Sequence, residues 1–139
     1  MDKTFKIVLL LLAISLIAFL VMGCSKQTGK TDGDKSNGYQ KITPAVVKER
    51  LDKGEKLIIV DVRTKEEYDG GHIPNSLLIP YDEIEAKAAT LLPDKNASII
   101  VYCRSGRRSE IAAKSLVKLG YSNVADMGAI SDWKYGLEK

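Results

Sequence analysis

The fold is decided by one stretch, residues 99–109, which reads Ile-Ile-Val-Tyr-Cys-Arg-Ser-Gly-Arg-Arg-Ser. Its first four residues are apolar, β-branched or aromatic, which is typical of a buried strand. From Ser109 to Leu119 apolar residues recur at spacings of one, three and four, which is typical of a helix, and Gly120 is a natural stop. The sequence therefore predicts a buried strand that is joined to a helix by a short loop.

This loop is expected to bind an anion. The backbone N–H groups of a tight loop, together with the unpaired amides that open the next helix, converge on one point. Arg104, Arg107 and Arg108 add positive charge around that point, and Gly106 supplies a turn position with positive φ. Cys103 is then expected to be a thiolate, because such surroundings commonly lower a thiol pKa from about 8.5 to about 7 or below.

The loop resembles the active-site loop of rhodanese-type sulfurtransferases, in which a strand-end cysteine accepts a sulfane sulfur as a persulfide and passes it on. Other parts of the chain match that family's pattern in order and spacing. They are Asp61-Val62-Arg63, Glu67-Tyr68 and Gly71-His72-Ile73-Pro74-Asn75-Ser76 before the loop, and Val124, Asp126-Met127-Gly128 and Trp133 after it. The resemblance covers about residues 41–139.

The resemblance implies a reaction. The Cys103 thiolate would attack the outer sulfur of thiosulfate or a similar small anionic sulfane donor, and sulfite would leave. The persulfide would then pass its sulfur to a thiol or cyanide acceptor, with ping-pong kinetics. The donor would be bound by the loop residues Arg104, Ser105, Gly106, Arg107, Arg108 and Ser109. The resemblance implies no cofactor, and a chain with one histidine is not expected to hold a metal. The oligomeric state is left open.

Asp61 and Arg63 follow a predicted strand and have two interpretations. A functional role beside the active site competes with a structural role, which the sequence favours. In the structural role Arg63 pairs with Glu66 or Glu67, while Asp61 caps nearby amides. The resemblance places His72 in a structural turn, and a general base is not needed when the thiolate is already ionised.

Strand and helix patterns alternate through residues 41–139. They predict an α/β fold with a largely parallel sheet and helices on both faces. Strands are expected at 39–42, 57–60, 76–79, 99–102 and 123–127. Helices are expected from 44, 65, 83, 109 and 129, with capping boxes that open at Thr64 and Asp82. The related family commonly has two glycines where this chain has Gly128-Ala129. If the second position needed left-handed backbone, alanine would cost about 1–2 kcal/mol there.

The first 23 residues differ in composition from the rest of the chain. Two lysines precede an apolar run from Ile7 to Met22. This run is short for a membrane span and suits the core of a signal peptide. Val21-Met22-Gly23-Cys24 resembles a bacterial lipoprotein signal, which implies cleavage and a lipid on Cys24. An uncleaved membrane anchor is the alternative.

Residues 24–40 are polar and almost free of apolar side chains, so a flexible tether is expected. Residues 42–139 hold fifteen basic and fifteen acidic residues, so the net charge of +3 comes from the N-terminal part. This distribution is no evidence for a nucleic-acid partner. A lipidated Cys24 would hold the domain outside the cytoplasm, at the cell membrane or at an outer membrane if the source has one. Cys103 would then be the free thiol of the mature protein.

Two other functions compete with sulfur transfer. Related folds carry cysteine-based phosphatases and arsenate reductases, whose loops place an arginine six positions after the cysteine. Here that position is Ser109, and Arg108 comes one residue early. The shorter loop suits one sulfur atom better than a four-oxygen phosphate. The other alternative is a non-catalytic binding or sulfide-sensing module that presents the anion pocket to a partner.

Overall fold

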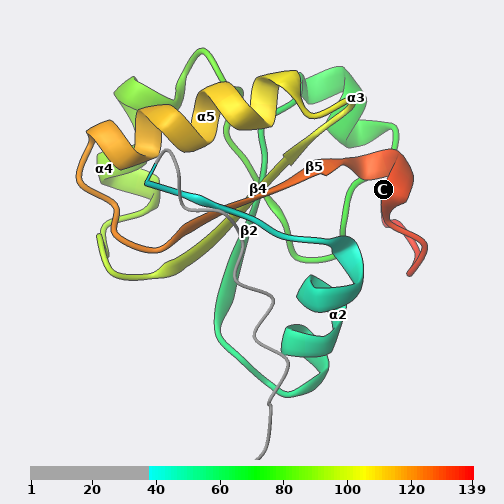
Figure 1. The fold of residues 1–139 in the computed structure, drawn as a ribbon. Coiled ribbons are helices and arrows are strands. Elements are labelled where there is room, and N and C mark those ends of the chain that lie inside the picture. The colour runs from blue at the N-terminus through cyan, green and yellow to red at the C-terminus, as the bar shows by residue number, and fades with distance from the viewer. Residues whose placement is uncertain (1–37) are drawn as a thin grey trace, which may run out of the picture. The chain divides into compact units, whose positions relative to one another are not determined.

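The computed structural model describes residues 38–139, which form an α/β domain (Figure 1). The predicted signal peptide, the predicted lipidation at Cys24 and most of the predicted tether lie outside these residues. Within the described range, no helix is both long enough and apolar enough to cross a membrane.

A five-stranded sheet forms the centre of the domain, in the order β1-β5-β4-β2-β3, and every neighbouring pair is parallel. Because β4 lies in the middle and is covered on both faces, its residues are almost all buried. The predicted α/β class is thereby confirmed, and the carboxyl ends of the strands share one edge of the sheet. The strands are β1 (Gln40–Lys41), β2 (Leu57–Asp61), β3 (Leu77–Leu78), β4 (Ser98–Cys103) and β5 (Val124–Ala129).

Helices lie on both faces of the sheet, as Figure 1 shows for α4 and α5 on one side and α2 on the other. Side chains of β4 alternate between the faces, so Cys103 packs on the α5 side while Tyr102 packs on the α2 side. The side-chain direction of the cysteine is therefore fixed by the strand that carries it. The helices are α2 (Pro44–Asp52), α3 (Lys65–Asp69), α4 (Ile84–Leu91) and α5 (Arg107–Lys118).

One of the two predicted capping boxes is present. At the start of α3 the Thr64 hydroxyl accepts the Glu67 N–H, and the Glu67 carboxylate accepts the Thr64 N–H. The capping box predicted at Asp82 is wrong, because a turn closed by the Glu83 N–H and the Pro80 carbonyl precedes α4. The first turn of α4 has no side-chain cap.

The helix predicted from residue 129 is also wrong. The chain forms one 3₁₀ turn, η1 (Ile130–Asp132), and then becomes extended at Trp133. The extended backbone lets the indole of Trp133 pack in the core cluster on the α2 side of the sheet, where it is 7% exposed. Its Nε1–H donates to the Gly136 carbonyl at 2.9 Å. Burial of this ring takes precedence over the helical pattern of the sequence.

The glycine of the Gly128-Ala129 pair is at the position that needs one. The pairing of β4 with β5 shifts by one residue before Gly128, which has φ of +84° and donates its N–H to the Asp126 carboxylate at 2.8 Å. Ala129 has φ of −90° and ψ of 132°, an ordinary extended conformation. The cost considered for alanine at this position therefore does not arise.

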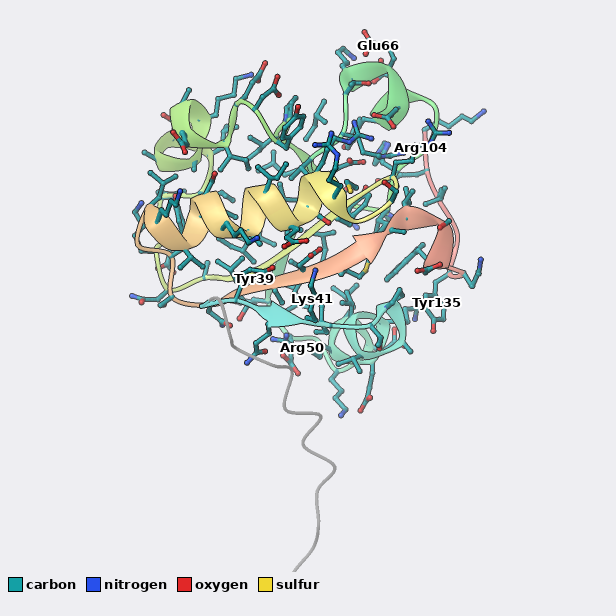
Figure 2. All side chains as sticks on the ribbon, turned by 45° about the horizontal axis from the view of Figure 1, so that its top comes forward. Tyr39, Lys41, Arg50, Glu66, Arg104 and Tyr135 are labelled. Atoms are coloured by element: carbon teal, nitrogen blue, oxygen red, sulfur yellow. The ribbon has the colours of Figure 1, made fainter. Side chains whose placement is uncertain are left out.

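The N-terminal edge of the fold begins before β1. Tyr39 is 4% exposed and belongs to the core cluster on the α5 side. Lys41 pairs with the buried carboxylate of Asp126 and so joins β1 to β5. Figure 2 shows Tyr39 and Lys41 on this edge. The edge strand expected at residues 39–42 is thus present as the shorter β1, and Tyr39 and Gln40 belong to the fold although the predicted tether was extended to residue 40.

Candidate active site

Cys103 is the last residue of β4, and its thiol lies under the loop that follows. The residue is fully buried. Its Sγ accepts the N–H of Gly106 at 3.0 Å and lies 3.6 Å from the hydroxyl oxygen of Ser109. The loop therefore encloses the sulfur atom. The buried strand, the short loop and the following helix predicted from the sequence are confirmed.

The surroundings of Cys103 favour its ionised form. Burial alone raises the pKa of the thiol, but hydrogen bonds from the Ser109 hydroxyl and from the backbone N–H groups of Ser109, Ser105 and Gly106 lower the pKa below its usual value. The Ser109 hydroxyl also lies 3.0 Å from the Gly106 carbonyl. It can therefore donate to that carbonyl beside a neutral thiol and turn to the sulfur when the thiol ionises.

Gly106 gives the loop its curvature. Its φ of +96° confirms the positive φ expected from the sequence, and it is the N-cap of α5. A Cβ atom here would approach the Gly128 Cα to 3.8 Å, so the active-site loop packs directly on the bulge of β5. The unpaired amides at the start of α5 thus lie next to the sulfur.

The three arginines of the loop differ in their exposure and in their ion-pair partners. Arg107 and Arg108 are successive residues of α5, whose side chains diverge by about 100°. Arg107 is exposed, and so is Arg104. Across residues 38–139 neither Arg104 nor Arg107 has an ion-pair partner. The binding of a donor anion by all three arginines stays a prediction, and among the three only Arg108 has an ion-pair partner within residues 38–139.

The Arg108 guanidinium forms an ion pair with the Glu67 carboxylate. Its guanidinium donates to both oxygens of the Glu67 carboxylate, at 2.7 and 2.8 Å. The hydrogen bonds from Arg108 lower the pKa of Glu67 to about 2, although burial alone would raise it. A cation is unfavourable beside the positive end of a helix, and the Glu67 carboxylate on α3 offsets this cost for Arg108. The sequence does not indicate this partner, because a separation of 41 residues carries no local signal.

Asp61 and Arg63 form a buried polar network beneath the site. The Asp61 carboxylate accepts three hydrogen bonds from the Arg63 guanidinium, at 2.9, 3.0 and 2.6 Å, and one from the Arg63 backbone N–H at 3.0 Å. The carboxylate also accepts the Tyr102 hydroxyl at 2.7 Å. The predicted partner of Arg63, Glu66 or Glu67, is therefore wrong. Asp61 does cap a backbone amide, as the structural interpretation expected, and the network ties the ends of β2 and β4 together.

His72 belongs to a packed turn. Its ring stacks on Tyr68 with centroids 3.7 Å apart, its Nδ1 lies 3.0 Å from the Tyr68 carbonyl, and its backbone bridges to Glu138. None of its recorded contacts in the described domain reaches Cys103. Within residues 38–139 no group of three or more potential ligands could hold a metal ion.

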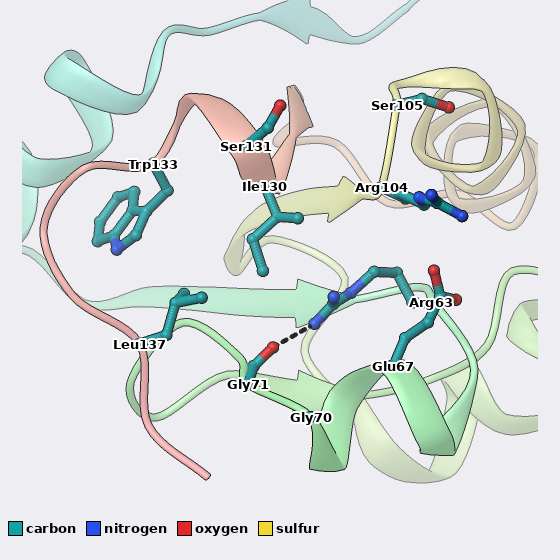
Figure 3. A pocket seen from close by; sticks show the side chains of 10 residues that line it. All are labelled: Arg63, Glu67, Gly70, Gly71, Arg104, Ser105, Ile130, Ser131, Trp133 and Leu137. Atoms are coloured by element: carbon teal, nitrogen blue, oxygen red, sulfur yellow. Dashed lines mark hydrogen bonds between the residues drawn. The ribbon is translucent and has the colours of Figure 1, made fainter.

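An open pocket of about 830 Å³ lies beside the loop, at the carboxyl ends of the strands (Figure 3). Arg104 and Ser105, the two residues after the cysteine, form part of its wall. Its lining has two different sides. The charged side holds Arg63, Glu67 and Arg104, and the apolar side holds Ile130, Trp133 and Leu137.

The domain has a parallel α/β fold and carries a buried cysteine at a strand end, in a loop lined by backbone amides. These features define a class of proteins that transfer groups through a thiol. Residues 43–135 match the model of the rhodanese-like domain. The chain belongs to the rhodanese-like domain family.

Similar proteins carry related names. The putative sulfur carrier protein YrkF of Bacillus subtilis is 35% identical over 109 residues, which are 78% of this chain and 58% of YrkF. Thiosulfate sulfurtransferase PspE of Escherichia coli is 38% identical over 73 residues, which are 52% of this chain and 70% of PspE. The chain thus spans little more than half the length of YrkF. A solved rhodanese with anions from E. coli shares 35% identity, with a TM-score of 0.57 over 60% of this chain and 98% of that one.

Proposed function

We propose that this protein is a rhodanese-type sulfurtransferase that carries sulfur as a persulfide on Cys103. The observation that supports this best is the cradle around Sγ, formed by the Gly106 N–H and the Ser109 hydroxyl. Both groups stabilise negative charge on sulfur, first on the thiolate and then on the persulfide. The names of PspE and YrkF, a thiosulfate sulfurtransferase and a putative sulfur carrier, point to the same chemistry.

The reaction has two steps. The Cys103 thiolate attacks the outer sulfur of thiosulfate, the S–S bond to the sulfonate sulfur breaks, and sulfite leaves with the electron pair. The outer sulfur of the persulfide is then attacked by an acceptor thiolate or by cyanide, and the Cys103 thiolate is regenerated. Arg104 and the loop amides bind the negatively charged donor. Arg107 and Arg108 remain predicted donor ligands. No redox partner is consumed in either step.

Phosphoryl transfer is less well supported. Arginines that act on phosphate oxygens need a free guanidinium directed at the cradle. Arg108, five residues after Cys103, is instead engaged by both oxygens of Glu67.

Intact-protein mass spectrometry of the purified full-length chain tests the proposal. After incubation with thiosulfate the wild type is expected to gain the mass of one sulfur atom, and cyanide or a thiol is expected to remove it. The Cys103→Ser variant should gain nothing. Steady-state kinetics should be ping-pong. An unchanged mass with thiosulfate and with polysulfide, in a folded and reduced protein, would favour the binding or sensing module, and sequential kinetics without a persulfide would also contradict the proposal.

We also propose that the chain is processed before Cys24 and anchored by a lipid on that residue, facing out of the cytoplasm. The support is the residue pattern from Ile7 to Cys24 alone.

A further inference from the structure

A second cavity, of about 250 Å³, lies on the α2 side of the sheet. Its lining comes from α2 and β2, from the turn at residues 73–75, and from the C-terminal segment that holds Trp133 and Tyr135. Cys103 packs on the opposite face of the sheet, and no residue of the loop 104–109 lines this cavity. Trp133 is the one lining residue that it shares with the pocket beside the loop. The cavity is therefore a separate site, which the sulfur-transfer chemistry does not use.

Most of the lining of this cavity is apolar, and two of its side chains are aromatic. The Trp133 and Tyr135 rings meet edge to face, with centroids 5.0 Å apart and an interplanar angle of 79°. Figure 2 shows Tyr135 beside α2. Tyr135 is 45% exposed, and Leu51 and Leu57 are half-buried, so apolar surface remains for a ligand to cover. Because aromatic rings pair favourably edge to face or offset-stacked, the ring of a ligand suits this wall.

The polar groups at the rim of the cavity favour a neutral ligand. Lys48 and Asp52 form an ion pair one helical turn apart, and the Lys48 ammonium also lies 5.8 Å from the centre of the Tyr135 ring. The two charges cancel, so a charged ligand would lose its hydration without gaining an opposite charge. Asn75 is the other polar residue of the lining. Its backbone N–H donates to the Glu138 carboxylate at 2.8 Å, while its exposed side-chain amide makes no hydrogen bond within residues 38–139.

We propose that this cavity binds a small neutral molecule with one aromatic ring and one hydroxyl group, of the phenol class. The ring contacts Trp133 and Tyr135, and the hydroxyl forms a hydrogen bond with the side-chain amide of Asn75. The volume supports a ligand of this size, since an apolar cavity of about 150 Å³ can bind benzene, whereas drug-sized ligands need about 300–1,000 Å³. This binding does not depend on the proposed sulfur transfer, because Cys103 takes no part in it.

The test titrates the full-length chain at pH 7 with p-cresol, which is neutral there because a phenol has a pKa of about 10. Trp133 is the one tryptophan of the chain, so selectively excited tryptophan emission reports on the cavity wall. The emission is expected to change saturably, and p-cresol should raise the urea midpoint of unfolding. The anion p-toluate and the cation p-methylbenzylammonium carry the same ring, and each should bind at least about tenfold more weakly. The saturated analogue methylcyclohexanol should bind about threefold more weakly, through loss of aromatic contact.

Matched variants locate the binding. Leu51→Phe places a larger side chain at a half-buried position of the lining, so it should weaken p-cresol binding about tenfold. Leu91→Phe makes the same change at an exposed leucine of α4 and should leave the affinity unchanged.

A second variant tests the hydrogen bond without filling the cavity. Asn75 has φ of +60°, which glycine adopts readily, so Asn75→Gly removes the amide and keeps the backbone. This variant should weaken p-cresol binding about fivefold but leave toluene binding unchanged, because toluene has no hydroxyl group.

Three results would overturn the proposal. One is a folded wild type in which p-cresol changes neither the emission nor the urea midpoint. Another is equal affinity for the neutral and charged probes. The third is p-cresol binding that survives Leu51→Phe but is lost in Leu137→Ala, because Leu137 lines the pocket beside the active-site loop and the ligand would then lie there. None of these results bears on persulfide formation at Cys103, which the mass measurement tests by itself.

Discussion

At the scale of single residues, Ser109 does the most to make Cys103 reactive. The thiol is fully buried, which by itself raises its pKa, and the hydroxyl of Ser109 provides the largest opposing contribution. A buried thiolate needs such donors, because it is solvated less than an exposed one. The loop arginines make no hydrogen bond to Sγ in the part of the chain that the structure describes. Ionisation is therefore controlled mainly by short-range hydrogen bonds.

Ser109→Ala is accordingly expected to move the midpoint of Cys103 ionisation to higher pH. The thiolate gains stability as pH rises through the thiol pKa, so a raised pKa leaves less thiolate at neutral pH. Loss of one hydrogen bond to a charged group, about 1.5 kcal/mol, should slow alkylation at pH 7 about tenfold. The rate of iodoacetamide alkylation against pH measures this. Ser115→Ala on the same helix is the control, and Ser109→Thr should restore the low midpoint. An unshifted profile for Ser109→Ala would contradict the role of the Ser109 hydroxyl in lowering the pKa of Cys103.

Gly128 and Ala129 differ in what their backbones require. Alanine at position 128 would take a φ of +84°, at a cost of about 1–2 kcal/mol, whereas position 129 is extended and accepts any residue. Gly128→Ala should therefore lower the free energy of unfolding by that amount. Ala129→Gly should cost no more than about 1 kcal/mol, through the entropy of the unfolded chain. Urea denaturation of the full-length variants measures both, and equal losses would contradict the bulge geometry.

At the scale of elements, α3 and α5 are joined beside the site by the pair of Glu67 and Arg108. The same glutamate closes the capping box of α3, so one side chain fixes the start of a helix and the orientation of an active-site arginine. This contact also holds the loop after β4 against the segment after β2.

The pair is expected to make stability depend on pH in the acid range. Glu67 has a usual pKa of 4.5 that folding lowers to about 2, so its contribution is complete above 4.5 and is lost as pH falls toward 2. Glu67→Gln should be about 2 kcal/mol less stable than the wild type at pH 7, and this difference should shrink as pH falls through that window. Urea unfolding at pH 7, 4 and 2.5 tests this, with Glu66→Gln as the control. A difference that does not change with pH would contradict the role given to the pair.

Elements whose pattern lies within a few residues could be predicted from the sequence. The strand to Cys103, the loop and the helix after it follow from local apolar periodicity and from Gly106, and they are confirmed. The last helix could not be predicted, since burial of Trp133 against the sheet determines the backbone there. Nor could the partners of Arg63 and Arg108, because ion pairs between loops depend on the packing of α3 against the strand ends.

At the scale of the whole molecule, the domain and the first 24 residues call for different tests. The domain of residues 42–139 is electrically balanced, so charge alone gives it no attraction to a membrane or to nucleic acid. Any association of the protein with a membrane should therefore depend on the N-terminal segment. The apolar run before Cys24 is short for a span, so a covalent lipid is the anchor that it suits.

Cys24→Ser is expected to abolish the lipid. When the full-length chain is expressed in bacteria with a palmitate analogue that can be detected chemically, the wild type should be labelled, should fractionate with membranes and should be shortened by the first 23 residues. The Cys24→Ser variant should be unlabelled and should keep its full length, because lipoprotein processing requires the lipidated cysteine. Cys103→Ser serves as the matched control and should be labelled like the wild type.

An unlabelled, full-length wild type in the membrane fraction would instead identify the segment from Ile7 to Met22 as an uncleaved anchor. A wild type found in the soluble fraction would exclude both forms of attachment and leave the transfer chemistry of Cys103 unaffected, since the residues that form the active site lie beyond residue 60.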